Sequence, residues 1–120
     1  MSTILVMDDE EQVRLLIREY LERADHQVLE AADGREGLRI FREQTADLVI
    51  VDLIMPGKEG LETIAELRRD DPEVKIIAIS GGGRVDANDY LLLAKNMGAL
   101  ITLNKPFTRQ ELLDSVQKLL

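Results

Sequence analysis

Three aspartates and one lysine are the residues of this chain best suited to do chemistry together. Asp8 and Asp9 follow one apolar run, Asp52 ends a second, and Lys105 follows a third. Short apolar runs that stop at polar groups are typical of buried parallel strands, whose carboxyl ends meet at one edge of a sheet. Three carboxylates gathered there repel one another unless a cation joins them. The pattern therefore indicates a divalent cation site beside an ammonium group.

The all-oxygen character of this cluster favours Mg²⁺, which takes one or two carboxylates and keeps several waters. Asp9 and Asp52 suit direct ligation, and Asp8 suits contact through a water. A carboxylate can also attack phosphorus and form an aspartyl-phosphate, with the metal offsetting the repulsion between the two anions. Lys105 could then pair with a phosphoryl oxygen, and the hydroxyl of Ser80, at the end of another apolar run, could bond the same group.

Each of these residues has a plainer interpretation when it is taken alone. An aspartate after a strand is commonly the N-cap of the next helix, and Asp9 could serve as both cap and ligand. A serine before a glycine run, such as Ser80, is common in turns, and a lone lysine is usually solvated. The coincidence of all the polar groups at the same ends of neighbouring strands favours the functional interpretation.

The segments between these residues alternate between strand and helix signals. Strands are expected at 4–7, 27–31, 48–52, 75–80 and 99–104, and helices at 10–24, after an Asp33 cap, from about 60 to 71, at 86–97 and from a Thr108 capping box to the last residue. Such βα units with short connections imply an α/β fold, a parallel sheet covered on both faces, in one domain over residues 1–120. The first helix is expected to bury one face, formed by Val13, Leu16, Ile17, Tyr20 and Leu21.

Composition excludes several other classes of protein. The chain has 120 residues, a 45% hydrophobic fraction and no cysteine, so a disordered chain, a disulfide framework and a thiolate metal site are excluded. A formal net charge of −8 argues against a nucleic-acid surface, which needs a basic patch. No apolar run approaches the length of a membrane span, which is about 20 residues. A soluble cytoplasmic protein without nucleic-acid or membrane partners is expected.

Taken in order, these motifs resemble the receiver domain of two-component response regulators over essentially the whole chain. Individually they are weak, but their order and spacing are highly specific. The residues that carry the resemblance are Asp8-Asp9-Glu10, Asp52-Leu53-Ile54-Met55-Pro56 with Gly60, Ser80, Gly98-Ala99 and Lys105-Pro106-Phe107.

The resemblance implies a phosphoacceptor module of a phosphorelay. Asp52 would receive a phosphoryl group from a histidine kinase or a histidine phosphotransfer protein. Mg²⁺ would be held by Asp9 and Asp52 directly, by Asp8 through water, and by the backbone carbonyl of Ile54. The resemblance also implies a flavodoxin-like (βα)5 doubly wound sheet with strand order 2-1-3-4-5, which puts the acidic residues at the topological switch point. Such a domain catalyses only its own phosphorylation and dephosphorylation.

The same resemblance implies how the signal leaves the site. Ser80 would be the switch hydroxyl that moves towards the phosphoryl group, and Lys105 would bond that group. The output surface would be formed by the helix at 86–97, the strand at 99–104 and the last helix, from 108 to 120. Its expected partner is a downstream protein or, after phosphorylation, a second copy of the chain.

Two features depart from the usual pattern of the family, and two further residues bear on the lifetime of the phosphoryl group. Thr102 stands where receiver domains commonly carry an aromatic residue, so the signal is expected to take a different route. The loop 81–86 is long and rich in glycine, and we expect phosphorylation to act by ordering it. The side chains of Ile54 and Gly82 cannot position a hydrolytic water, so slow self-dephosphorylation is expected.

Three alternatives share part of this pattern. A flavodoxin would have to bind a phosphate at its first loop, where Asp8-Asp9-Glu10 would repel it. A Mg²⁺-dependent aspartyl phosphohydrolase of the haloacid dehalogenase-like type carries an acid/base aspartate two residues after the nucleophile, where this chain has Ile54. A receiver that belongs to a longer regulator with a DNA-binding or enzymatic output stays open.

Overall fold

The structure, a computed structural model, describes residues 2–53, 60–81, 92, 94–96 and 98–120 of the chain. Strands and helices alternate from residue 3 to residue 81, as the sequence predicts. The elements are β1 (Thr3–Met7), α1 (Glu11–Arg23), β2 (Gln27–Ala31), α2 (Gly34–Glu43), β3 (Leu48–Asp52), α3 (Gly60–Asp70), β4 (Ile76–Gly81), β5 (Ile101–Lys105) and α5 (Arg109–Leu119). Three predictions fall largely outside the described residues: the glycine-rich loop, most of the helix at 86–97, and Ile54 as a ligand.

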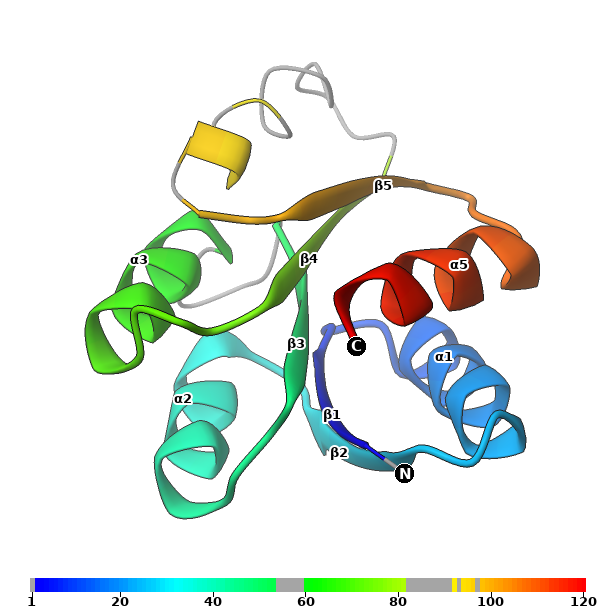
Figure 1. The fold of residues 1–120 in the computed structure, drawn as a ribbon, viewed down its shortest axis with the longest axis horizontal. Helices are drawn as coiled ribbons and strands as arrows, with labels where there is room; N and C mark the ends of the chain where they lie inside the picture. The colour runs from blue at the N-terminus through cyan, green and yellow to red at the C-terminus, as the bar shows by residue number, and fades with distance from the viewer. Residues whose placement is uncertain (1, 54–59, 82–91, 93, 97) are drawn as a thin grey trace.

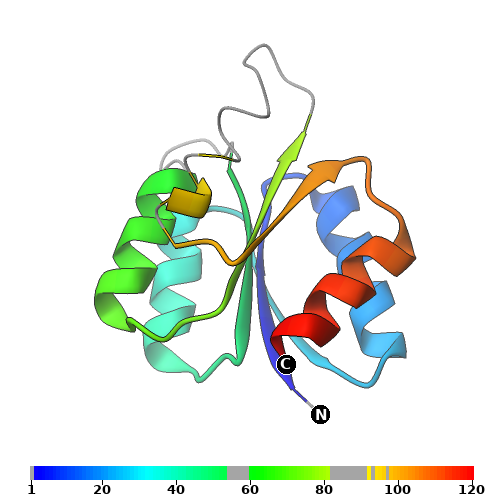
Figure 2. The ribbon, with the colours of Figure 1, turned by 45° about the horizontal axis from the view of Figure 1, so that its top comes forward.

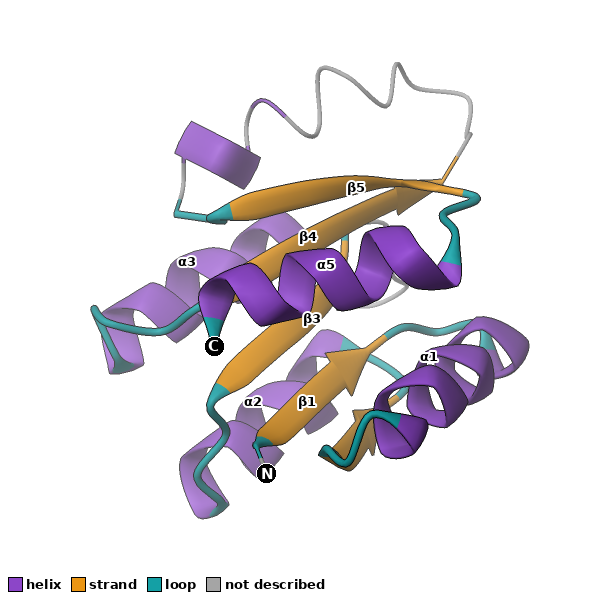
Figure 3. Cartoon of the chain, turned by 45° about the vertical axis from the view of Figure 1, so that its right-hand side comes forward, coloured by secondary structure: helices purple, strands orange, loops and turns teal. Residues whose placement is uncertain are grey.

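The five strands form one parallel sheet in the order β2-β1-β3-β4-β5, so the predicted strand order is confirmed. Figures 1 and 2 show the sheet between two helical layers, with α1 and α5 on one face and α2 and α3 on the other. In Figure 3 the α1 and α5 layer lies in front of the sheet. This arrangement leaves the carboxyl ends of β1 and β3 next to each other at the centre of the molecule.

The alternation of side chains along each strand divides the core into two clusters, one on each face of the sheet. In β3, Val49 and Val51 belong to the cluster under α2 and α3, whereas Leu48 and Ile50 belong to the cluster under α1 and α5. All four side chains are fully buried. A strand that is apolar on both faces is what a central parallel position requires, and the two helical layers supply the burial.

The helix starts test the predicted caps. Asp33 caps α2 by accepting a hydrogen bond from the Glu36 amide at 2.8 Å, and Thr108 opens α5 with a full capping box, as predicted. The prediction that Asp9 caps α1 is wrong. Glu10 holds the N-cap position without any side-chain cap bond, and Asp8 Oδ1 instead accepts from the Glu10 amide at 2.9 Å.

The buried face of α1 is narrower than the sequence predicts. Ile17 and Leu21 are fully buried, and Val13 and Tyr20 pack against the same cluster while partly exposed. Leu16 is 42% exposed, so its assignment to the buried face is wrong. A helix that covers the edge of a sheet has one stripe in contact with it, and residues about 100° away from that stripe reach solvent. Among the described helices, none has the length and apolar character that crossing a membrane would require.

Candidate functional site

Lys105 joins the acidic residues that follow two other strands. Its Nζ lies 3.0 Å from Asp8 Oδ2, 3.0 Å from Glu10 Oε1 and 3.4 Å from Asp52 Oδ2. Lys105 is at the end of β5, Asp8 and Glu10 are in the loop after β1, and Asp52 is at the end of β3. One ammonium therefore contacts carboxylates that are up to 97 positions away along the chain, counted from 8 to 105. The sequence prediction that these groups meet at one edge of the sheet agrees with this geometry.

The sheet register brings the strand ends to the same level. Met7 pairs with Val51 across the β1–β3 ladder, so the residues that follow them, Asp8 and Asp52, lie side by side. On the other side of β3 the register continues through β4 to β5, where Gly81 pairs with Lys105. Backbone pairing therefore fixes the positions of Asp52 and Lys105, and Asp8 follows directly from the paired end of β1.

A close approach of α3 to the end of β3 holds the Asp52 backbone. The Gly60 amide donates a hydrogen bond to the Leu53 carbonyl at 3.1 Å. A Cβ atom at position 60 would lie 2.4 Å from the Asp52 carbonyl oxygen and 2.5 Å from Leu53 Cα. Because these atoms belong to the backbone, they cannot rotate away, and only glycine fits between them.

The electrostatics of the site depend on burial. Asp8 and Asp52 are almost completely buried, while the Lys105 side chain keeps 14% of its exposure. Burial by itself lowers the pKa of the Lys105 ammonium, but the charge of Asp52, the contacts with Asp8 and the hydrogen bond to Glu10 outweigh it and hold that pKa above its ordinary value. The ammonium therefore stays charged and acts as the resident counter-ion of two buried carboxylates.

A second ion-paired group, which the sequence analysis missed, contacts the backbone of the loop after β1. Arg14, on α1, donates from Nη1 to the Asp8 carbonyl oxygen at 2.8 Å and from Nε to Glu30 Oε1 at 2.9 Å. Arg18, one turn further along α1, also pairs with Glu30. The i, i+4 spacing of the two arginines was the available signal, although their partner on β2 could not be identified without the sheet register.

The acidic residues that the structure groups together include two of the predicted metal ligands, Asp8 and Asp52, and add Glu10. Carboxylate oxygens of Asp8, Glu10 and Asp52 all lie within 4.8 Å of one another, which suits an oxygen-coordinated divalent cation such as Mg²⁺. Asp9, the predicted direct ligand, has an exposed side chain and lies outside this group. The chain turns after β1, where the Glu10 amide donates to Asp8 Oδ1, and the carboxylates of Asp8 and Glu10 both contact Lys105. Direct ligation by Asp9 stays a prediction.

Ser80 lies where the switch hydroxyl is expected, near the end of β4. The residue is 1% exposed, and its Oγ has no hydrogen-bond partner within the described part of the chain. A buried hydroxyl without a partner is unfavourable, so this group is available to an acceptor that enters the site. Thr102 pairs with Ala78 across the β4–β5 ladder and is partly buried.

Comparison with known proteins gives a consistent family. A profile described as response regulator receiver domain matches residues 4–117. The chain is 32% identical over 117 residues to sporulation initiation phosphotransferase F of Bacillus subtilis, which covers 98% of this chain and 92% of that protein. A response regulator receiver domain protein from Clostridium thermocellum superposes with a TM-score of 0.92 at 35% identity, covering 99% of this chain and 94% of that one. The response regulator TrrA from Thermotoga maritima, solved in complex with Mg²⁺-BeF, superposes with a TM-score of 0.86 at 34% identity over 100% of both chains.

Proposed function

The chain belongs to the response regulator receiver domain family, and on that premise we propose that it is a phosphoacceptor module in which Asp52 takes up a phosphoryl group. The observation that carries the proposal is that the largely buried Lys105 side chain contacts both Asp52 and Asp8 through its ammonium group. These contacts lie at the carboxyl ends of the central strands. A nucleophilic carboxylate needs neighbouring positive charge before a phosphoryl dianion can approach it. Lys105 supplies part of that charge.

In the proposed step, one carboxylate oxygen of Asp52 attacks phosphorus. The new O–P bond forms while the bond from phosphorus to the donor breaks, which is P–N for phosphohistidine and P–O for acetyl phosphate. The bonding pair leaves with the imidazole nitrogen or with acetate. Lys105 then pairs with a phosphoryl oxygen, and the Ser80 hydroxyl donates to another. A bound Mg²⁺ would offset the charge of the two anions. The expected ligands Asp8, Asp9 and Asp52 would hold it, and the carboxylates of Asp8 and Asp52 lie together in the structure.

The proposed partners follow from this chemistry. The donor is a histidine kinase or a histidine phosphotransfer protein, and the output partner is a downstream protein or a second copy of the chain. The proposed output surface is formed by β5, α5 and the helix before β5. Leu92 and Leu100 are 61% and 50% exposed there, which supports a surface that a partner covers. We propose a cytoplasmic location and no catalytic activity beyond the domain's own phosphorylation and dephosphorylation.

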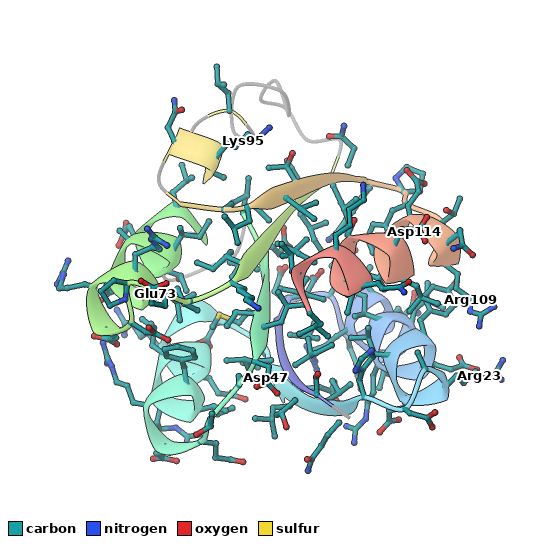
Figure 4. All side chains as sticks on the ribbon, in the orientation of Figure 1. Arg23, Asp47, Glu73, Lys95, Arg109 and Asp114 are labelled. Atoms are coloured by element: carbon teal, nitrogen blue, oxygen red, sulfur yellow. The ribbon has the colours of Figure 1, made fainter. Side chains whose placement is uncertain are left out.

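The test is phosphate incorporation measured by the mass of the intact protein. Incubation with acetyl phosphate and Mg²⁺ should add one phosphoryl group to the wild type, and none when a chelator replaces the metal. Asp52→Asn should abolish the addition. The matched control is Asp114→Asn, which removes the same charge from an exposed carboxylate on α5 (labelled in Figure 4). Incorporation by Asp52→Asn at the wild-type level would contradict the proposal.

A further inference from the structure

Glu10 breaks a local rule of helix formation, and the structure shows where its side chain goes instead. It holds the N-cap position of α1, where Asn, Asp, Ser and Thr are favoured because their short side chains reach the first free amides. The Glu10 side chain makes no cap bond. Its Oε1 accepts a hydrogen bond from Lys105 Nζ at 3.0 Å, across 95 positions of the chain.

Glu10 differs from the other two partners of Lys105 in its exposure. The side chains of Asp8 and Asp52 are 1% and 5% exposed, whereas that of Glu10 is 60% exposed. Its backbone is fixed, because the Glu10 amide donates to Asp8 Oδ1 at 2.9 Å. The carboxylate can therefore leave Lys105 by rotating into water without any movement of the main chain, and an exposed ion pair opposes such a rotation only weakly.

We propose that Glu10 is the exchangeable counter-ion of Lys105. It pairs with the ammonium while Asp52 carries no anion, and it gives up its position when an anion is bound there. The proposal rests on the proposed function, because that function makes Asp52 the place where the anion arrives. Lys105 Nζ donates hydrogen bonds to Glu10 and Asp52 and forms an ion pair with Asp8, so an anion that enters this contact shell competes with one of these carboxylates.

The displaced partner is Glu10 because the two aspartates are buried and cannot turn to solvent. Until it is displaced, its negative charge also repels the arriving anion. Glu10 is then a positioning residue that opposes occupation of the site, and removing its charge should make occupation easier. This sets it apart from a metal ligand, whose removal would make occupation harder because the cation would be held less tightly.

The first measurement needs neither metal nor anion. The ammonium signal of Lys105 is followed by NMR in the free protein and assigned with Lys105→Arg. Glu10→Gln should speed proton exchange of this ammonium several-fold, because its outer hydrogen bond is weakened. Glu11→Gln is the matched control: it removes the same charge one residue later, from an exposed glutamate at the start of α1. Equal exchange rates in wild type and Glu10→Gln would overturn the proposal.

The second measurement uses beryllofluoride at saturating Mg²⁺ as a phosphoryl-like anion that does not react. Glu10→Gln should bind it about fivefold more tightly, the factor that corresponds to removing a unit charge about 4 Å away in water. Glu11→Gln should change the affinity much less. Equal affinities of the two variants, or weaker binding by Glu10→Gln, would overturn the proposal. Undiminished binding by Asp52→Asn would instead contradict the proposed function, while the exchange measurement would still decide whether Glu10 holds Lys105.

Discussion

Replacing Lys105 by methionine should destabilise the metal-free protein by an amount that the site geometry sets. Methionine keeps most of the apolar stem of the side chain but removes the ammonium, and so leaves Asp8 and Asp52 buried without their counter-ion. Removing one partner of a buried ion pair costs about 3–5 kcal/mol. Because the Lys105 side chain is 14% exposed, we expect the lower end, about 3 kcal/mol. At roughly 4 °C per kcal/mol for a domain of this size, the melting temperature should fall by about 12 °C.

The assay is thermal unfolding in chelator and in increasing Mg²⁺. The metal replaces the missing positive charge, and a cation at a 100-fold excess over its dissociation constant stabilises the fold by about 2.7 kcal/mol. Mg²⁺ should therefore restore most of the stability of the variant, and raise its melting temperature more than that of the wild type, where the ammonium competes for the same oxygens. Lys118→Met, at an exposed position near the end of α5, is the control. A variant that melts within about 2 °C of the wild type in chelator would refute the reasoning.

Two further predictions concern the supports of the site. Burial raises the pKa of Glu30, but its pairing with Arg18 and Arg14 outweighs this effect and holds the pKa below its ordinary value of 4.5. These ion pairs therefore stabilise the folded protein above pH 4.5, and this stabilisation is lost as the pH falls through the lower pKa of the folded state. In urea unfolding, Glu30→Gln should cost about 1–2 kcal/mol at pH 7 and much less near pH 3; an equal cost at both values would contradict the pairing. Gly60→Ala should cost about 1–3 kcal/mol and slow phosphorylation by acetyl phosphate, because its Cβ would overlap the Asp52 and Leu53 backbone. Wild-type phosphorylation by this variant would show that the close approach does not position Asp52.

The strands and most helix ends could be predicted from the sequence because their signals are local. The run 48–51 is apolar without alternation, which is typical of a strand buried on both faces, and β3 occupies these residues and Asp52. Thr108 with Glu111 is a capping box in which each residue's role follows from a spacing of three. Local patterns of this kind depend on backbone geometry, and the packing of the fold agrees with the strand and the cap that they predict.

The composition of the acidic group could not be predicted because it depends on side-chain direction beyond the end of a strand. From the sequence, Asp9 and Glu10 are equivalent acidic residues after β1. In the structure the chain turns at Asp8, whose carboxylate accepts from the Glu10 amide, and this turn directs Glu10 towards Lys105 and Asp9 towards solvent. The contact of Arg14 with the Asp8 carbonyl escaped prediction for the same reason, since it joins a helix to a loop through a geometry that no spacing encodes.

The position of Lys105 suggests how a change at Asp52 would travel. Two buried carboxylates already need this ammonium in the unmodified protein, so it cannot serve a phosphoryl group without changing its existing contacts. Phosphorylation would raise the negative charge at Asp52 to about two units and draw Lys105 towards it. Lys105 ends β5, which among the described residues is an edge strand paired with β4 alone, so the sheet holds its backbone from one side. A displacement of Lys105 would therefore move β5, the strand that carries Thr102 and precedes α5. The proposed output surface would then change its conformation without an aromatic switch residue.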